Sequence, residues 1–234
     1  MKINIWSDTR CPFCYIGKHH FEKALANFEY KNKVKVIWHS FQLDAGLQTN
    51  LDIDYITFLH QIKGFPKEQI EQMTKQIVNT AKEAGLVFNM KDSKVANSFK
   101  AQMLVQMAKE NGKDNEMEEA LFAAQFTHGI NIDDVEELQK IGISLGYSAE
   151  EVKKAVTTEK YAYGITQDIQ TANQIGVKGV PFFIFNDKYA VSGAQPVALF
   201  EEVLQKSWEE FSSGDQGLNI ISEGNVCDLD GNNC

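Results

Sequence analysis

The two cysteines of Cys11-Pro12-Phe13-Cys14 are the residues whose type and spacing point most directly to chemistry. They follow an apolar run at residues 3–6 and precede a pattern of helical periodicity, so Cys11 is predicted at a helix N-terminus. The unpaired N–H groups and the positive end of the helix dipole favour a thiolate there, and Pro12 suits a first turn because its missing N–H is not needed. Cys11 is therefore the expected nucleophile. Cys14, one turn further on, is expected to close a disulfide with it and to reopen it by exchange.

The sequence alone leaves two other uses of this cysteine pair open. A Cys-x-x-Cys can be half of a zinc site, but such a site needs a second Cys or His pair at matching spacing. His19 and His20 follow too closely on the same predicted helix, and Cys227 and Cys234 are remote and widely spaced. The pair could also be two inert buried thiols. We expect redox chemistry, with no metal and no bound cofactor.

Composition limits the partners of this chain. Of its 234 residues, 43% are hydrophobic and 15 are Phe, which is enough for a substantial core. The formal charge of −9 and the absence of a Lys/Arg cluster argue against nucleic acid and anionic membranes as partners. Neither a signal peptide nor an apolar run of membrane-spanning length is found in the sequence. We therefore expect a cytoplasmic protein, in a compartment where thiols are kept reduced.

The predicted elements form a βαβ unit around the cysteines. A strand at residues 2–6, a helix at 15–30 and a second strand at 34–38 place the Cys-x-x-Cys at the first strand-to-helix junction. That position is typical of a thioredoxin-like redox fold. Residues 40–51 are predicted to be a loop. Late in the chain we predict a helix at 160–175, a buried strand at 182–185, an antiparallel partner at 189–191 and a closing helix at 197–211.

The middle of the chain has helical spacing and no convincing strand. Helices are predicted at residues 54–63, 67–84, 94–111, 115–128, 133–145 and 149–157. Such a block must pack on itself and against the sheet. The predicted fold class is therefore α/β, a thioredoxin-like fold with a large all-helical insertion. The predicted domains are a discontinuous thioredoxin-like domain at 1–51 and 159–212, a helical insertion at 52–158 and a tail at 213–234.

Pro181 stands at the head of a predicted buried strand, where proline is unusual unless its missing N–H is useful. In a fold of this kind, a cis Val180-Pro181 bond would expose the Val180 backbone beside the Cys11 sulfur, so that an extended substrate strand could pair there. Val180 and Pro181, together with Pro12 and Phe13, are the predicted substrate-binding residues.

Four segments carry a resemblance to a known family. They are WSDTRCPFCYIGK, ANSFKA, LFAAQF and IGVKGVPFFIFNDKYAVSGAQP, and in this order they resemble the FrnE-like subfamily of the DsbA thiol-disulfide oxidoreductases, through about Trp208. The resemblance implies a thioredoxin fold interrupted by a helical domain, Cys11 as attacking thiol, Cys14 as resolving thiol and cis-Pro181 opposite them. Two positions depart from the family pattern. The dipeptide between the cysteines is Pro-Phe where DsbA has Pro-His, which reduces hydrogen bonding to the thiolate, and Gln102 stands where the subfamily commonly has His.

Three functions are compatible with this sequence. The first is a thiol-disulfide oxidoreductase or isomerase that acts on protein or glutathione-like thiols and disulfides. The second is a glutathione-dependent transferase or isomerase, because the kappa-class glutathione transferases and the hydroxychromene-carboxylate isomerases share the helical insertion. Those enzymes have Ser where Cys11 stands, so the intact pair favours the first. The third is a non-catalytic, chaperone-like binding module.

The tail at 213–234 contains no Lys or Arg and few apolar residues, so we expect it to extend beyond the closing helix with little core of its own. Cys227 and Cys234 bracket a short segment with Gly and Asn that could fold back on itself. We favour an auxiliary redox pair that exchanges electrons with Cys11 and Cys14. A plain structural disulfide and two separate thiols are the alternatives.

Overall fold

The computed structural model describes residues 1–213, 219–223 and 227–228. In chain order the elements are β1 (Lys2–Ser7), α1 (Pro12–Asn27), η1 (Lys31–Lys33), β2 (Lys35–Ser40), β3 (Asn50–Asp54), α2 (Tyr55–Gln61), α3 (Lys67–Glu83), β4 (Lys94–Val95), α4 (Phe99–Lys109), α5 (Asp114–Phe122), η2 (Ala123–Thr127), α6 (Val135–Ser144), α7 (Ala149–Ala155), α8 (Glu159–Gln174), β5 (Gly179–Val180), β6 (Phe182–Phe185), β7 (Tyr189–Ser192), α9 (Val197–Ser213), β8 (Asn219–Glu223) and β9 (Cys227–Asp228).

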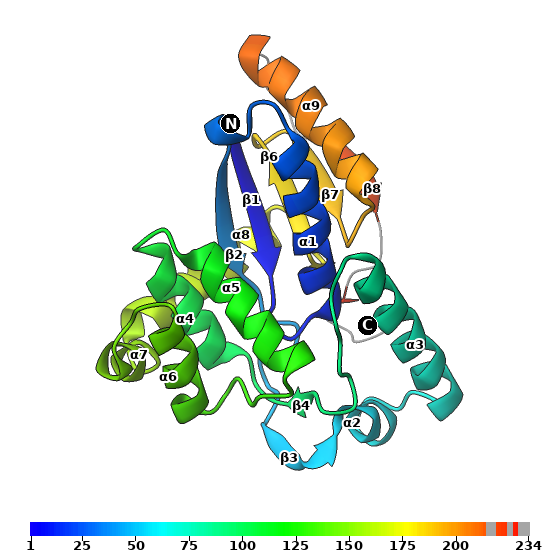
Figure 1. Ribbon diagram of the computed structural model, residues 1–234, viewed down its shortest axis with the longest axis vertical. Coiled ribbons are helices and arrows are strands. Elements are labelled where there is room, and N and C mark those ends of the chain that lie inside the picture. Colours follow the sequence, from blue (N-terminus) through cyan, green and yellow to red (C-terminus); the bar gives the residue numbers. More distant parts are fainter. Residues whose placement is uncertain (214–218, 224–226, 229–234) are drawn as a thin grey trace.

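A five-stranded sheet of order β2-β1-β6-β7-β8 forms the centre of the molecule. β1 pairs in parallel with β2 and antiparallel with β6, and β6 pairs antiparallel with β7. Figure 1 shows α1 and α9 in front of this sheet and α8 behind it. The predicted α/β class and thioredoxin-like fold are confirmed, because helices cover both faces of a sheet that starts with the predicted βαβ unit.

The alternation of side chains along β6 explains the two faces. Phe183 and Phe185 point to the side of α1 and α9, where they contact the rings of Phe21 and Phe200. Phe182 packs instead in the cluster that contains Cys11 and Cys14. Successive residues of a strand face opposite sides, so one short Phe-rich strand supplies the core on both faces of the sheet.

The helices α2 to α7 lie between β2 and α8 in the chain and cover the lower end of the sheet in Figure 1. Two predicted helix starts are confirmed. Asp134 is the N-cap of α6 and accepts from the N–H groups of Glu136 and Glu137, and Ser148 forms a capping box with Glu151 at the start of α7.

The prediction that this segment lacks strands is wrong. β3 pairs antiparallel with β4, so the helix predicted at 94–111 begins only at Phe99. Asn97 explains the delayed start: its side chain accepts from the Phe99 N–H at 2.7 Å and donates to the Leu47 carbonyl at 2.8 Å. These side-chain bonds hold residues 94–98 outside the helix. The helix predicted at 115–128 ends differently too, because α5 passes into the π-helical turn η2 at Ala123–Thr127.

The tail was expected to add little to the core, but its backbone extends the sheet. β8 pairs in parallel with β7, and β9 pairs antiparallel with β5, immediately before Pro181. Within the part of the chain that the structure describes, no helix has the length and apolar character needed to cross a membrane.

Candidate active site

Cys11 is the N-cap residue of α1, and Pro12 is the first residue of that helix. The Cys11 N–H donates to the Asp8 carbonyl at 2.9 Å, and the Cys14 N–H donates to the Cys11 carbonyl at 3.1 Å. These bonds fix the turn that carries the pair. Both side chains are buried, with 0% of Cys11 and 1% of Cys14 exposed. The predicted position of Cys11 at a helix N-terminus is confirmed.

Val180 and Pro181 face this turn from the other half of the fold. The Val180-Pro181 peptide is cis, as predicted. The Cys11 Sγ lies 3.5 Å from the Val180 carbonyl oxygen, to which its S–H donates. Gly17 permits the close approach of Pro181 to α1, because a Cβ at position 17 would meet the Pro181 Cγ at 3.0 Å. The structure thus brings Cys11 and Val180 together across 169 residues of sequence.

The environment of Cys14 differs from that of Cys11. Burial raises the pKa of the Cys14 thiol well above its ordinary value, and the adjacent Cys11 sulfur raises it further. The Asp8 N–H and the Ser7 hydroxyl lower it, but do not offset the burial. Cys14 therefore holds its proton at neutral pH, and a protonated thiol is a poor nucleophile.

The aromatic residue between the two cysteines is part of the core in this structure. Phe13 is 7% exposed and packs in the same apolar cluster as Trp6 and Phe182. Pro12 is buried as well. Pro12 and Phe13 both lie beside the thiols, and both side chains are almost entirely buried.

Sequence reasoning missed Glu118, a residue of α5 with no exposed surface. Burial raises the pKa of its carboxyl to about 8, against the opposing charge of Lys18. A signal for this burial exists in the sequence, since Glu118 lies three and four residues before Leu121 and Phe122 and therefore on their buried helix face. Ser7, at the end of β1, lowers the pKa of both Glu118 and Cys14. Its buried hydroxyl oxygen has no hydrogen-bond partner among the described residues.

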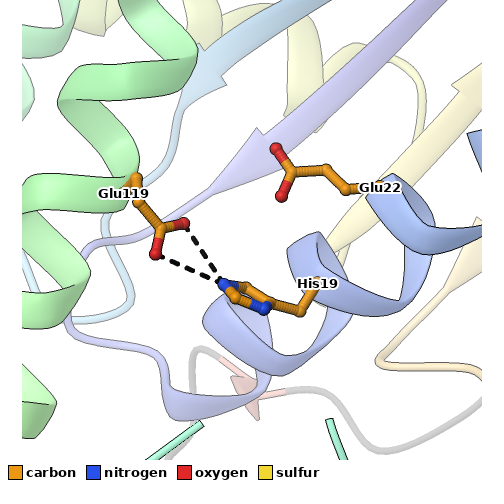
Figure 2. Close-up of side chains that lie close together, drawn as sticks. All are labelled: His19, Glu22 and Glu119. Carbon is orange, nitrogen blue, oxygen red and sulfur yellow. Dashed lines mark hydrogen bonds and ion pairs between the residues drawn. The ribbon is translucent and has the colours of Figure 1, made fainter. Parts of the chain in front are cut away.

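A second charged group on α5 ties the helical segment to α1. Figure 2 shows His19 and Glu22 projecting from α1 toward Glu119. The Lys18 ammonium lies 2.6 Å from Glu119 and 2.8 Å from Glu22, and the Tyr15 hydroxyl donates to Glu119 at 2.7 Å. Burial raises the pKa of the Glu119 carboxyl, but the bonds from His19 and Lys18 outweigh it and bring the pKa to about 2.

The donor atoms of His19, Glu22 and Glu119 lie within 4.8 Å of one another, a spacing that a metal ion could bridge. However, the Lys18 ammonium already bonds both carboxylates, and a second cation there would meet its charge. We therefore assign this cluster to the packing of α5 on α1. It does not include Cys11 or Cys14, so it does not complete the zinc site considered from the sequence.

The two tail cysteines differ in what the structure describes. Cys227 lies in β9, in register opposite Val180. Cys234 lies outside the described residues. The predicted pairing of these two cysteines therefore stays a prediction.

A sheet of this order, with a Cys-x-x-Cys at the start of the first helix and a cis-proline facing it, defines a thioredoxin-like protein. The family model described as DSBA-like thioredoxin domain matches residues 2–205, and the chain therefore belongs to this family.

Three relatives illustrate the similarity. The uncharacterized protein YwbO of Bacillus subtilis is 28% identical over 204 residues, which cover 86% of this chain and 94% of YwbO. The crystal structure of the probable DsbA oxidoreductase SCO1869 from Streptomyces coelicolor is 33% identical, with a TM-score of 0.83 and coverage of 99% of this chain and 97% of that one. The cytosolic disulfide reductase DsbM from Pseudomonas aeruginosa shares the fold at 17% identity, with a TM-score of 0.58 and coverage of 91% and 98%.

Proposed function

We propose that this protein is a thiol-disulfide oxidoreductase in which Cys11 attacks and Cys14 resolves. The asymmetry of the pair carries this proposal. Cys11 caps α1, where the N–H groups of the first turn can stabilise a thiolate, and it faces the Val180 carbonyl. Cys14 lies one turn further into the helix, where burial raises the pKa of its thiol. One sulfur is thus suited to the first attack and the other to the second.

In the reducing direction, the Cys11 thiolate attacks one sulfur of a substrate disulfide, and the other substrate sulfur leaves as a thiolate that takes a proton from water. Cys14 then loses its proton and attacks the Cys11 sulfur. The bond between Cys11 and the substrate breaks, the second substrate sulfur leaves as a thiol, and a Cys11–Cys14 disulfide forms. Two electrons have passed from the pair to the substrate. The reverse sequence oxidises a dithiol substrate.

The edge of β5 is the proposed docking position for an extended substrate. β9 supports this proposal, because a strand of the chain itself pairs antiparallel with β5, with Cys227 opposite Val180. A substrate strand in the same register would bring its residue opposite Val180 next to the carbonyl that contacts Cys11. Pro181, Pro12 and Phe13 would flank that strand, and β9 would have to leave the edge first.

The proposed substrates are protein disulfides and glutathione-like disulfides or the corresponding thiols. DsbM, which shares the fold, has a structure with glutathione, and a glutathione-like thiol is the proposed source or acceptor of electrons. The intact cysteine pair favours exchange over the glutathione-dependent transferase or isomerase reaction, in which a serine replaces the first thiol. A chaperone-like module would keep its activity without both thiols, which separates that function by experiment.

We further propose the domain division given above, with residues 52–158 inserted into a thioredoxin-like domain at 1–51 and 159–212, and membership of the FrnE-like subfamily. The formal charge of −9 supports a protein without nucleic-acid or membrane partners. A cytoplasmic location is proposed on the similarity to a cytosolic reductase.

The proposed auxiliary role belongs to Cys227, together with Cys234. The register of β9 places the Cys227 backbone opposite Val180, so a thiol from the tail could exchange with Cys11 without a large movement of the chain. Cys227→Ser keeps the strand and removes the thiol, whereas deletion of residues 224–234 removes β9 and keeps β8. Both should alter turnover with a disulfide substrate. Full turnover in both variants, with no disulfide to Cys227 in oxidised samples by mass spectrometry, would exclude an auxiliary pair.

The test of the function itself is turnover with glutathione disulfide and with insulin as a protein disulfide. Wild-type protein should reduce at least one of them at the expense of a dithiol, and Cys11→Ser should abolish that turnover. Equilibration of the Cys11/Cys14 pair with glutathione gives its reduction potential, where about 30 mV shifts the two-electron equilibrium tenfold and so decides the favoured direction. Equal turnover in wild type and Cys11→Ser would refute the function.

A further inference from the structure

The turn that carries Cys11 presents one charged side chain to the surface. Every residue from position 5 to position 18 is buried except Arg10, which is half-buried and immediately precedes Cys11. Cys11 itself has no exposed surface. A substrate that approaches the Cys11 sulfur therefore meets the Arg10 side chain beside its target.

The backbone of this turn is held in place, whereas the Arg10 guanidinium is not engaged. The Arg10 N–H donates to the Asp8 carboxyl at 3.1 Å, and the Leu43 N–H donates to its other oxygen at 2.8 Å. The Cys11 N–H donates to the Asp8 carbonyl at 2.9 Å. Among the described residues, no hydrogen bond or ion pair involves the guanidinium. Its donors are therefore available to a ligand.

Arg10 is the only arginine in the sequence, although Lys and Arg together number 23. A guanidinium holds its N–H donors in a rigid plane that matches the two oxygens of a carboxylate, which the ammonium group of lysine does not. Paired bonds of this kind are among the strongest hydrogen bonds in proteins. The chain thus has lysine at its other cationic positions and the carboxylate-binding group only beside the nucleophile.

An aromatic side chain from the helical segment borders the same turn. Tyr55, at the start of α2, packs against the apolar cluster that contains Cys11 and Phe13. Burial raises the pKa of the Tyr55 hydroxyl, and the charge of Arg10 opposes this rise. Apolar surroundings strengthen the attraction between a guanidinium and an anion, because they lower the local dielectric constant.

Lys18 illustrates the contrast with a paired cation. It lies further along α1, and its ammonium bonds Glu22 at 2.8 Å and Glu119 at 2.6 Å. The formal charge of −9 also repels anions from the protein as a whole. A preference for an anionic substrate would therefore depend on the local charge of Arg10.

We propose that Arg10 binds a carboxylate of the substrate and so selects small disulfides that carry a carboxylate close to the sulfur. This inference rests on the proposed function and names the substrate class of its first step. Glutathione disulfide, which has carboxylates on both halves, belongs to this class. The Cys11 thiolate supplies the electron pair of the new S–S bond to one half, which Arg10 holds. The other half leaves as a thiolate with the electron pair of the broken S–S bond.

Three small disulfides of similar size separate recognition of charge from the reactivity of the thiol. Dithiodipropionic acid carries two carboxylates, bis(2-hydroxyethyl) disulfide is neutral, and cystamine carries two ammonium groups. Reduced protein in a Cys14→Ser, Cys227→Ser and Cys234→Ser background is mixed with each disulfide, and mass spectrometry gives the rate constant for adduct formation on Cys11. The ratio of the rate constants for the dianion and the neutral disulfide measures the preference.

Arg10→Gln should lower this ratio about tenfold, as expected for the loss of one charge-assisted contact, and should raise the relative rate with cystamine. Arg10→Lys should recover part of the preference, because it keeps the charge without the planar fork. Lys23→Gln, which removes one charge from an exposed position of α1, is the matched control and should leave the ratio unchanged. A changed acidity of Cys11 acts on all three reactions and cancels in the ratio.

The outcomes distinguish the inference from the function on which it rests. If none of the three disulfides forms an adduct on Cys11, the proposed function fails. If adducts form but the ratio is the same with Arg10 and with Arg10→Gln, the role of Arg10 is refuted and the function stands. An equal fall of the ratio in Lys23→Gln would also overturn it, since that result indicates an effect of net charge.

Discussion

Replacing Glu118 by Gln should remove most of one contribution to the pH dependence of stability. In the unfolded chain this carboxyl ionises near its ordinary pKa of 4.5, and in the folded protein burial raises the pKa to about 8. Between these values the folded state binds one proton more than the unfolded state, so the free energy of unfolding falls by about 1.4 kcal/mol per pH unit, or about 5 kcal/mol in all. This loss of stability is absent well below pH 4.5, grows as pH rises, and is complete above about pH 8.

Urea unfolding of wild type and Glu118→Gln at about pH 5 and about pH 8 measures this effect, and the variant should gain about 3 kcal/mol relative to wild type between the two. Groups that titrate in both proteins contribute equally and cancel in the difference. The charges of Lys18, Asp8 and Asp114, which lie near Glu118, also shift the pKa of Glu118. Glu116→Gln, exposed on the same helix, should show no such gain. A difference between Glu118→Gln and wild type that does not change with pH would refute the assignment of Glu118 as a buried carboxyl with a raised pKa.

Three further predictions concern the elements that hold the site. Gly17→Ala adds a Cβ 3.0 Å from the Pro181 Cγ. The crowding should cost about 2 kcal/mol, more than the gain of about 1 kcal/mol in helix propensity. The midpoint of urea unfolding should therefore fall, and a higher midpoint would contradict this expectation. Ser148→Ala removes the capping box with Glu151 and should cost about 1 kcal/mol in urea unfolding, whereas an unchanged midpoint would deny the cap a role. The pKa of Glu119 lies below its ordinary value of 4.5, so the ionised carboxylate stabilises the fold above pH 4.5, and this stabilisation is lost as pH falls through about 2. On acidification, Glu119→Gln should therefore lose less stability than wild type in acid unfolding. Equal losses in the two proteins would contradict this prediction.

Much of the fold follows from local patterns that the sequence displays. The strands of the sheet core were predictable because their apolar runs are short and bounded by turn residues, as at Phe182–Phe185. Helix starts at Asp134 and Ser148 were predictable because their caps are local side-chain bonds. The antiparallel pairing of β3 with β4 was not predictable, since Asn97 withdraws its segment from a helical pattern through a bond to the distant Leu47 carbonyl.

The site divides in the same way. The placement of Cys11 and Cys14 at the start of α1 and the cis bond before Pro181 were predictable, because they follow from residue spacing and from a strand-to-helix junction. Glu118 was not, because whether a carboxyl on an amphipathic helix is solvated or buried depends on how α5 docks against α1 and β1. The position of β9 opposite Val180 also depends on tertiary pairing, which the composition of the tail does not specify.

Trapping the first covalent intermediate tests the central claim most directly. Reduced Cys14→Ser protein, in the Cys227→Ser and Cys234→Ser background, is mixed with glutathione disulfide and analysed by peptide mass spectrometry. The account predicts a stable glutathione adduct on Cys11, because the resolving thiol is gone. Cys11→Ser in the same background should remain unmodified under these conditions. An adduct on Cys14 in the Cys11→Ser protein, with Cys11 unmodified in the Cys14→Ser protein, would contradict the assignment of Cys11 as the attacking thiol.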